Sequence, residues 1–415
     1  MKPGYKQTEI GVIPEDWEVR TLGSLTTLLT NGFVGTATTA YVESGDGVLY
    51  IQGYNVQENG FNFHGIKRVS KAFHTRNKKS CLQAGDLLTI QTGDIGVTTI
   101  VPPELVGANC HALIISRLRK QESEPGYYCQ YFNSERGRVA FKEIETGTTM
   151  KHLNGGDMKR LFLPSPPVEE QRAIAGTLSD VDGLLGSLDQ LIAKKRDLKQ
   201  AAMQQLLTGK KRLPGFHGEW EVKQLGDCLL SRPDYGINAA AVPFSDKLPS
   251  YIRITDISED GRFCPDPRVS VKAASADQYY LHRGDVVFAR TGASVGKSYL
   301  YDTRDGELVF AGFLIRVRPN PEFLVAAFLA AYATTKPYWN WVRLMSMRSG
   351  QPGINGNEYA QLPLVLPELP EQTAIAKVLT DMDAELAALA QRREKTRALK
   401  QAMMQELLTG KTRLV

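Results

Sequence analysis

The chain has 415 residues, a formal net charge of +5, 42% hydrophobic residues and 23% charged residues. These values are typical of a soluble protein with two or more domains, and the small positive charge allows a polyanionic partner without indicating one. Five cysteines without CxxC spacing argue against a disulfide framework or a zinc site. The first residues lack the apolar run of a signal peptide and no apolar stretch is long enough to span a membrane, so we expect a cytoplasmic protein.

The chain begins with a short segment, residues 1–17, which leads into a first domain at residues 18–165. Alternating and β-branched residues bounded by Gly and Asp predict strands at 86–92 and 112–118, and we expect a helix at 127–134. The first domain is therefore predicted to be of the α+β class, with mixed helices and strands.

Two loops of this domain are candidates for contact with nucleic acid. They read QTGDIGVTT from Gln91 and ETGTTMKHLNGGD from Glu145. Small, hydroxyl and amide side chains with a few bases suit contacts to base edges and phosphates. The candidate side chains are Gln91, Thr92, Thr149, Lys151 and His152. The alternative for each is a surface residue that touches nothing. Two interpretations are also open for the basic clusters: contact with the nucleic-acid backbone, or a solvated face. The clusters are Lys67-Arg68, Lys71, Arg76 and Lys78-Lys79.

Residues 166–212 predict a long helix. The helix is expected to begin at a segment with proline and acidic residues and to end at a Thr-Gly pair. It would contain about 40 residues and be about 60 Å long, at 1.5 Å per residue. Apolar residues recur in steps of four and three, which is typical of a coiled-coil seam. The seam residues are Ile174, Leu178, Val181, Leu185, Leu188 and Ile192. The alternative is a helix packed on its own domain.

A second domain follows at residues 213–367, whose first residues belong to the short RLPGF link. Strands are predicted at 285–291 and 312–318, and a helix at 323–335. The loop RTGASVGKS resembles a phosphate-binding loop, but it has one residue too few between its glycines, and the following SYLYD is typical of a strand. Contact with nucleic acid through Arg290, Thr291 and Lys297 is favoured, with a solvated hairpin as the alternative. The loop RSGQPGINGNE adds Arg348 and Gln351.

The last segment, residues 368–415, repeats the long helix. The offset of 201 residues holds without a gap, as between Gln171 and Gln372. This second long helix starts from the second domain, so it must run back toward the first domain if it pairs with the helix at 166–212. The pair is therefore predicted to be antiparallel. Its seam residues are Ile375, Leu379, Met382, Leu386 and Leu389.

The repeat is also circular. The chain ends at TRLV, where the first repeat continues with LPGFHGEW, and it starts with IGVIPEDW. The two chain ends are therefore expected to lie near each other, with a pseudo-twofold internal repeat. The domains match more weakly than the helices. Trp17-Glu18-Val19 aligns with Trp220-Glu221-Val222, and Leu153-Asn154 aligns with Ile354-Asn355. The two helices are therefore expected to have the same function. The two domains are expected to have a second function in common, in two different versions.

Catalytic motifs are missing from the sequence. There is no glycine-rich cofactor loop, no NPPY-like segment, no spaced nuclease acid cluster and no HExxH spacing among the six histidines. A non-catalytic protein is therefore expected. The alternatives are a single-chain DNA methyltransferase or nuclease, and a coiled-coil scaffold without a DNA role.

Three sets of residues carry a family resemblance: the duplicated EEQRAIA…LLTGK and PEQTAIA…LLTGK helices, the GTTMKHLN segment, and the IPEDWEV and GEWEV segments at the starts of the two domains. Together they resemble the specificity subunit of type I restriction-modification systems. The resemblance implies two target recognition domains separated by two long antiparallel coiled-coil helices. Each domain would read one half of a split double-stranded DNA site, and the helices would set the spacer and bind two methyltransferase subunits. The second loop RSGQPGIN departs from the usual Ser/Thr/Gln-rich form, which weakens transfer of roles to Gln351 and Asn355.

The resemblance also implies the remaining partners and cofactors. Restriction/translocase subunits would complete a restriction endonuclease and adenine methyltransferase. No cofactor is expected in this chain, because S-adenosylmethionine, ATP and Mg²⁺ would be bound by the partner subunits.

Overall fold

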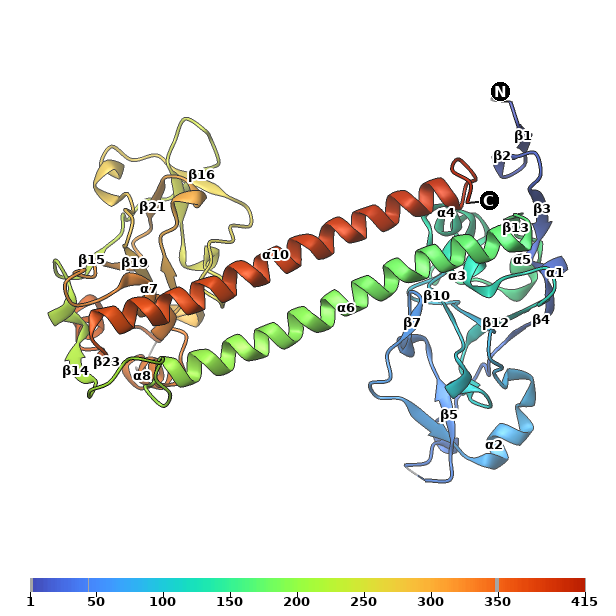
Figure 1. Ribbon diagram of the computed structural model, residues 1–415, viewed down its shortest axis with the longest axis horizontal. Helices are drawn as coiled ribbons and strands as arrows, with labels where there is room; N and C mark the ends of the chain where they lie inside the picture. Colours follow the sequence, from blue (N-terminus) through green and yellow to red (C-terminus); the bar gives the residue numbers. More distant parts are fainter. Residues whose placement is uncertain (1–2, 44, 348–350, 415) are drawn as a thin grey trace. The chain divides into compact units, whose positions relative to one another are not determined.

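The computed structural model describes residues 3–43, 45–347 and 351–414. The chain divides into two compact units. Unit 1 contains residues 1–189 and 391–415, and unit 2 contains residues 190–390. Both units mix helices and strands, and each takes in one half of each long helix, so the predicted fold class and its long helices are confirmed (Figure 1).

Unit 1 is built on a four-stranded sheet in the order β10-β9-β12-β4, with a smaller sheet β11-β5-β8. The strands of this unit are β1 Tyr5–Thr8, β2 Gly11–Pro14, β3 Glu18–Thr21, β4 Thr26–Asn31, β5 Val48–Ile51, β6 Val56–Gln57, β7 Gly60–Phe61, β8 Lys67–Val69, β9 Leu87–Ile90, β10 Thr98–Ile100, β11 Asn109–Cys110, β12 Leu113–Leu118 and β13 Phe162–Ser165. Its helices are α1 Leu22–Leu25, α2 Lys71–Arg76, α3 Pro125–Asn133, α4 Glu135–Ile144, α5 Gly155–Arg160 and the start of α6 Val168–Leu206.

Unit 2 repeats the central sheet in the order β20-β19-β22-β15, beside a second sheet β16-β18-β17-β21. Its strands are β14 Glu221–Gln224, β15 Asp234–Tyr235, β16 Ala241–Pro243, β17 Ser250–Ile252, β18 Val269–Val271, β19 Val286–Ala289, β20 Ser298–Leu300, β21 Leu308–Phe310, β22 Leu314–Val317 and β23 Pro363–Leu366. Its helices are α7 Ala326–Tyr332, α8 Lys336–Met345, α9 Gly356–Ala360 and the start of α10 Leu369–Leu407.

The four predicted strands are confirmed as β9, β12, β19 and β22, and the predicted helix at 127–134 is α3. The helix predicted at 323–335 is shorter, because its first residues belong to a turn in which the backbone NH of Phe323 donates to Asn320. Helices α4 and α8 were not predicted. Gly137 lowers the helix propensity of α4, yet a Cβ at that position would lie 2.1 Å from the Tyr131 carbonyl oxygen. Close packing of α4 on α3 therefore requires this glycine.

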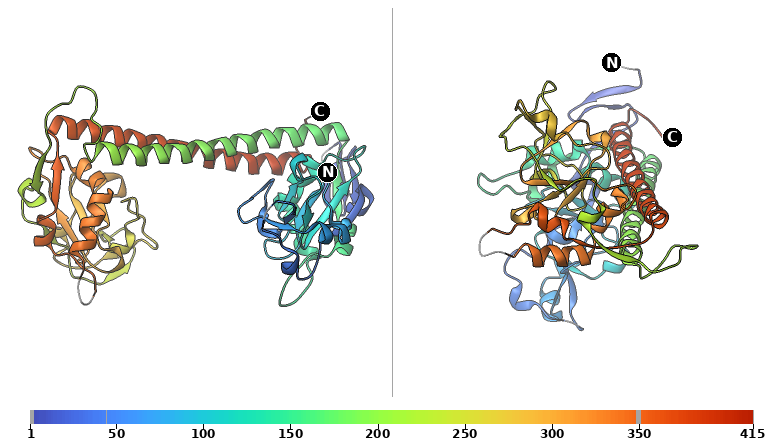
Figure 2. Two further views of the ribbon diagram at one scale, coloured as in Figure 1. Left: turned by 90° about the horizontal axis from the view of Figure 1, so that it is seen from below. Right: turned by 90° about the vertical axis from the view of Figure 1, so that its left-hand side faces the viewer.

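Helices α6 and α10 each contain 39 residues, or about 58 Å of helix. In unit 1 the first half of α6 lies beside the last half of α10, and in unit 2 the last half of α6 lies beside the first half of α10 (Figures 1 and 2). In unit 1, Asp182 and Asp189 of α6 pair with Lys400 and Arg393 of α10, at 2.6 and 3.1 Å. In unit 2, Lys195 and Lys199 of α6 pair with Glu385 and Asp383 of α10, at 2.7 and 2.6 Å. The two helices therefore run antiparallel within each unit.

The seam residues of the two helices differ in burial. Ile174, Leu178 and Leu188 of α6 and Ile375 and Leu379 of α10 are buried, as is Ile192. The remaining five are half-buried: Val181, Leu185, Met382, Leu386 and Leu389. Ile174 and Leu178 belong to the core of unit 1 together with Tyr127 and Tyr128 of α3, and Ile375 and Leu379 belong to the core of unit 2. The first turns of each helix thus pack on the domain that precedes it.

A polar contact joins each domain to the helix pair. In unit 1 the Asp182 carboxylate accepts hydrogen bonds from Gln130 Nε2 at 2.8 Å and from Asn59 Nδ2 at 3.3 Å, in addition to its ion pair with Lys400. In unit 2 the Asp383 carboxylate lies 3.5 Å from the Arg262 guanidinium, in addition to Lys199. The Asp182 network joins partly buried polar groups, whereas the Arg262–Asp383 pair is more exposed, with side chains 56% and 39% accessible. These two carboxylates therefore orient each domain on its own portion of the helix pair.

The two chain ends meet in unit 1, as the circular repeat predicts. The Tyr5 hydroxyl donates to the Gly410 carbonyl oxygen at 2.9 Å. Arg413 forms ion pairs of 2.6 Å with both Asp16 and the buried Glu170, which also accepts a hydrogen bond from Trp17 Nε1. Hydrogen bonds from Arg413 lower the pKa of the Asp16 carboxyl, so this carboxyl stays charged at neutral pH.

Unit 2 contains the matching arrangement within a continuous stretch of chain. Arg212, which follows α6, pairs with the buried Glu371 of α10 and lies over the Trp220 ring at 5.7 Å. Arg413 lies over the Trp17 ring at 5.9 Å. The segment before Trp17 therefore completes the helical region of unit 1 in the way that the RLPGF link does in unit 2.

Candidate nucleic-acid interface

The first candidate loop of unit 1 starts where strand β9 ends. Gln91 follows Ile90 directly, and its amide oxygen accepts a hydrogen bond of 2.6 Å from Asn31 Nδ2 at the end of β4. Its backbone carbonyl oxygen accepts a hydrogen bond of 3.0 Å from the Leu153 backbone NH. The structure thus brings the two candidate loops of the first domain into direct contact, although about 60 residues separate them in the sequence. Thr92 lies half-buried beside Gln91.

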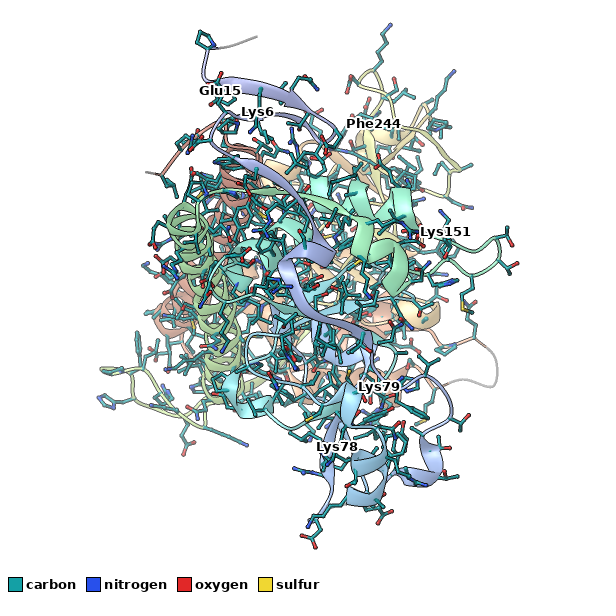
Figure 3. All side chains as sticks on the ribbon, turned by 90° about the vertical axis from the view of Figure 1, so that its right-hand side faces the viewer. Lys6, Glu15, Lys78, Lys79, Lys151 and Phe244 are labelled. Atoms are coloured by element: carbon teal, nitrogen blue, oxygen red, sulfur yellow. The ribbon has the colours of Figure 1, made fainter. Side chains whose placement is uncertain are left out.

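The second candidate loop of unit 1 is a narrow hairpin. Thr146 and His152 pair through both backbone hydrogen bonds, at 3.0 and 2.9 Å, and the residues between them are exposed, Thr149 included. Gly147 has φ +100°, and a Cβ there would lie 2.3 Å from the Met150 carbonyl oxygen, so the turn requires glycine. Lys151 lies at the base of this hairpin and pairs with Glu145 at 3.2 Å (Figure 3). The loop therefore exposes Thr148, Thr149 and Met150 on a turn that is held by two backbone hydrogen bonds.

The equivalent loops of unit 2 make the same contact. The Ile354 backbone NH donates to the Arg290 carbonyl oxygen at 2.8 Å, and the Gly292 NH donates to Pro352 at 3.1 Å. Thr291 is bridged to Gly353. The Arg290 guanidinium lies 5.1 Å from the centre of the Tyr235 ring. Gln351 is exposed, and Arg348 lies outside the described residues.

Lys297 does not join this contact. It pairs with Glu259 at 2.7 Å, on a turn that precedes Arg262. The Lys297 side chain is only 19% exposed, so it is a weaker candidate for a phosphate contact than the Lys151 side chain, which is 57% exposed.

Arg290 lines an open groove of about 720 Å³ in unit 2. The lining includes residues 236–239 and the exposed ring of Phe313. An arginine held against an aromatic ring beside a groove can present its planar donors to a flat polar partner, such as a base edge.

Basic side chains cluster in the second sheet region of unit 1. Lys67, Lys71 and Arg76 are exposed, as are Lys78 and Lys79 beside α2 (Figure 3). Arg68 is half-buried and donates to the Gly47 carbonyl oxygen. Lys71 lies 3.5 Å from the Asp46 carboxylate, and the other four exposed cations are placed as phosphate contacts require, on the surface of the domain.

The sequence did not indicate the partners of Gln91 and Arg290. These partners are Asn31 and Tyr235, each the last residue of a strand and each followed by a glycine. A Cβ at Gly32 would lie 2.7 Å from the Cys110 carbonyl oxygen, and one at Gly236 would lie 2.3 Å from that of Phe310. The recurring glycine at equivalent places in the two domains was the signal that could have located them.

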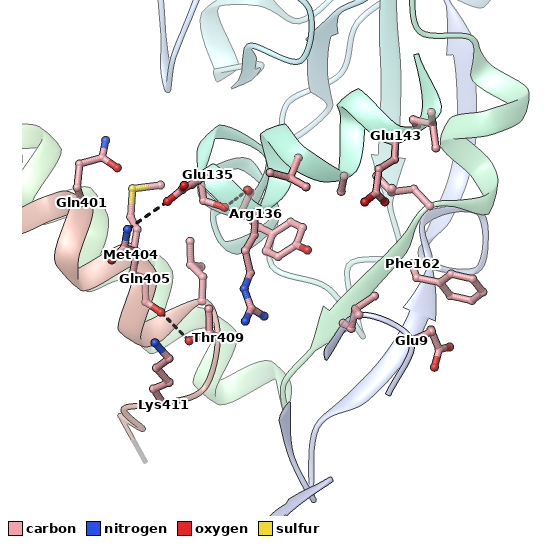
Figure 4. A pocket seen from close by; sticks show the side chains of 18 of the residues that line it. Glu9, Glu135, Arg136, Glu143, Phe162, Gln401, Met404, Gln405, Thr409 and Lys411 are labelled. Atoms are coloured by element: carbon pink, nitrogen blue, oxygen red, sulfur yellow. Dashed lines mark hydrogen bonds between the residues drawn. The ribbon is translucent and has the colours of Figure 1, made fainter. Parts of the chain in front are cut away.

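A separate groove of about 680 Å³ lies in unit 1 between α4 and the C-terminal turns of α10 (Figure 4). Gln405 of α10 donates to the Glu135 carboxylate of α4 at 3.2 Å across one end of it. Its rim carries three acidic and three basic side chains: Glu9, Glu135, Glu143, Arg136, Arg160 and Lys411. This balance of charge does not favour a polyanion, so the groove is not part of the candidate interface.

Within the described residues, no group of three or more His, Cys, Asp or Glu side chains is arranged to hold a metal ion. In the same part of the chain, no helix combines the length and the apolar character needed to cross a membrane.

Comparison with known proteins identifies both halves of the repeat. Residues 14–194 and 217–397 each match the family model of the type I restriction modification DNA specificity domain. A specificity subunit of the type I restriction enzyme MjaX from Methanocaldococcus jannaschii is 26% identical, over 99% of this chain and 97% of that protein.

Two solved structures share the fold. The S subunit of a type I restriction-modification system from M. genitalium has a TM-score of 0.58 and 18% identity, over 98% of this chain and 99% of that one. A chain from a study of complex assembly and conformational transition of the type I R-M system has a TM-score of 0.58 and 19% identity, over 96% of this chain and 99% of that one.

Proposed function

Because this chain belongs to the type I restriction-modification DNA specificity family, we propose that each of its two domains reads one half of a two-part DNA site. The chain is the DNA-recognition subunit of such a system and not its catalytic subunit. The first domain, residues 18–165, would contact one half-site, and the second domain, within residues 213–367, would contact the other.

One observation carries this proposal. The two domains have the same central sheet order and the same loop contact, Leu153 on Gln91 and Ile354 on Arg290, but different side chains at these places. The helices that follow the domains match each other more closely than the domains do, without a gap, at an offset of 201 residues. Base edges are distinguished by the donors and acceptors of side chains. A split, asymmetric target therefore requires two domains with the same fold and different side chains at the positions that contact bases.

The helices α6 and α10 would set the spacer between the half-sites. Each is a single uninterrupted helix of 39 residues, and the Asp182–Lys400 and Lys199–Asp383 ion pairs fix its register with the other. A register held by ion pairs in each unit would resist sliding, and a helix pair of set length would then act as the spacer.

The same helices offer docking positions for two methyltransferase subunits. Leu198 in unit 2 and Leu399 in unit 1 are equivalent in the repeat, and they expose 49% and 57% of their surface. Equivalent exposed leucines in two repeats suit two copies of one partner, each with an apolar contact.

The proposed complex places all chemistry in the partners of this chain. The methyltransferase subunits would bind S-adenosylmethionine, and the restriction/translocase subunits would use ATP and Mg²⁺. Double-stranded host DNA is the common substrate, so the complex would work in the cytoplasm.

Domain exchange tests the proposal. Residues 221–367 are replaced with the matching domain of another specificity subunit, and methylated sites are mapped in a host without other methylation. One half-site should change, while the other half and the spacer stay the same. The matched control replaces residues 18–165 and should change the opposite half. Changes in both halves after a single exchange would contradict independent reading, and an unchanged site would contradict DNA reading by the exchanged domain.

A further inference from the structure

The central sheets of the two units have equivalent registers, which allows their residues to be matched one to one. Ile90 of β9 pairs with Leu113 of β12, and Ala289 of β19 pairs with Leu314 of β22. One residue further along β12 and β22, Ile114 pairs with Asn31, and Ile315 pairs with Tyr235. Gln91 is therefore equivalent to Arg290, and Asn31 is equivalent to Tyr235.

These matched pairs occupy the same backbone setting. The carbonyl oxygens of Gln91 and Arg290 accept from Leu153 and Ile354 of the second loops. Helices α5 and α9 begin beside the partner residues: a Cβ at Gly155 would lie 3.2 Å from Asn31 Oδ1, and the Gly356 NH donates to the Tyr235 hydroxyl at 3.0 Å. The backbone contacts around these residues are thus equivalent in the two domains, and the side chains are what differ.

We propose that Gln91 and Arg290 are base-reading residues at equivalent positions, with Gln91 reading an adenine and Arg290 reading a guanine. This inference rests on the proposed function of the two domains and names the bases that one residue of each would select.

The guanidinium of Arg290 is available for a base. Within residues 3–43, 45–347 and 351–414, no carboxylate lies within 4.0 Å of it, and the Tyr235 ring at 5.1 Å supports it from one side. Arg316 on β22 shows the contrast, because it is buried and pairs with Asp234 and Asp285. A planar fork of donors held on an aromatic ring matches the O6 and N7 acceptors of guanine.

The amide of Gln91 offers an acceptor as well as a donor, whereas the Arg290 guanidinium offers donors alone. Its oxygen accepts one hydrogen bond from Asn31, which orients the amide, and a carbonyl oxygen has a second lone pair. The oxygen can therefore also accept from the N6 amino group of adenine while the amide nitrogen donates to N7. This two-point contact is the one by which glutamine selects adenine.

The test uses the complex of this chain with its methyltransferase subunits. Binding is measured by competition against DNA in which each base pair of both half-sites is varied singly. The native complex should prefer guanine at one position read by the second domain. Arg290→Ala should remove that preference alone, by about 5- to 150-fold, with other positions unchanged. Arg290→Gln should shift the preference at that position towards adenine, and Gln91→Arg should shift one position of the other half-site from adenine to guanine.

Arg283→Ala is the matched control, since Arg283 is an exposed arginine on the turn before β19, and it should leave every base preference unchanged. Native preference at the unaltered half-site reports that each variant is folded. The inference is overturned if Arg290→Ala keeps every base preference, weakens all sequences equally or alters a position that is not guanine. A native complex without base preference in either half-site would instead refute the proposed function.

Discussion

A seven-residue insertion into both α6 and α10 is expected to lengthen the preferred DNA spacer by about three base pairs. The insertions lie after Asp189 and after Ala390, where the chain passes between the two units. Seven residues add about 10.5 Å of helix and preserve the four-three spacing of the apolar seam. B-DNA rises about 3.4 Å per base pair, so the added length corresponds to about three base pairs. The measurement is a map of methylated sites in a host that carries the variant complex.

A four-residue insertion into α6 alone is the contrasting variant. It leaves α10 unchanged, so the Asp182–Lys400 and Lys199–Asp383 ion pairs can no longer form together. Methylation at the original sites should fall by at least about 100-fold, because the lost register also misplaces the domain-orienting contacts of Asn59 and Arg262. Full-rate methylation of the original sites by either variant would show that the helices do not set the spacer.

Leu198→Glu is expected to remove one methyltransferase subunit from the complex, and Leu399→Glu is expected to remove the other. Each places a carboxylate at the centre of a proposed apolar contact, where its desolvation costs several kcal/mol. The double variant should retain neither subunit and should lose site-specific methylation. Native mass spectrometry of the purified complexes counts the bound subunits directly.

Gln200→Glu is the matched control for this charge, because Gln200 is an exposed residue two positions after Leu198 and faces a different side of α6. The control complex should keep both subunits. If both single variants also bound two methyltransferase subunits with native affinity, the docking surface would lie elsewhere on the chain.

The long helices and the circular repeat were predictable because they depend on local pattern. A four-three spacing of apolar residues and a gapless offset are visible without knowledge of tertiary contacts. The meeting of Arg413 with Asp16 follows from the same repeat. The helix α8 was not predictable in this way, since aromatic residues such as Trp339 and Trp341 have modest helix propensity, and the helix is stabilised by packing around the buried Tyr338.

The candidate interface was predictable only in part. Gln91 and Arg290 could be selected because each follows a clear strand and begins a glycine-bearing loop. Their partners Asn31 and Tyr235 could not, because strand pairing between β4 and β12, and between β15 and β22, decides which residue lies beside them. Lys297 illustrates the opposite case, in which a promising basic residue is paired with a carboxylate that only the fold brings near.

The central claim is that this chain directs its complex to a two-part DNA site. The most direct measurement is a genome-wide map of methylated bases in a methylation-deficient host that carries this chain and its methyltransferase partner. The account predicts methylated adenines within a single asymmetric motif, made of two specific halves separated by a spacer of fixed length and unspecified sequence. A continuous motif, or methylation without sequence preference, would contradict it.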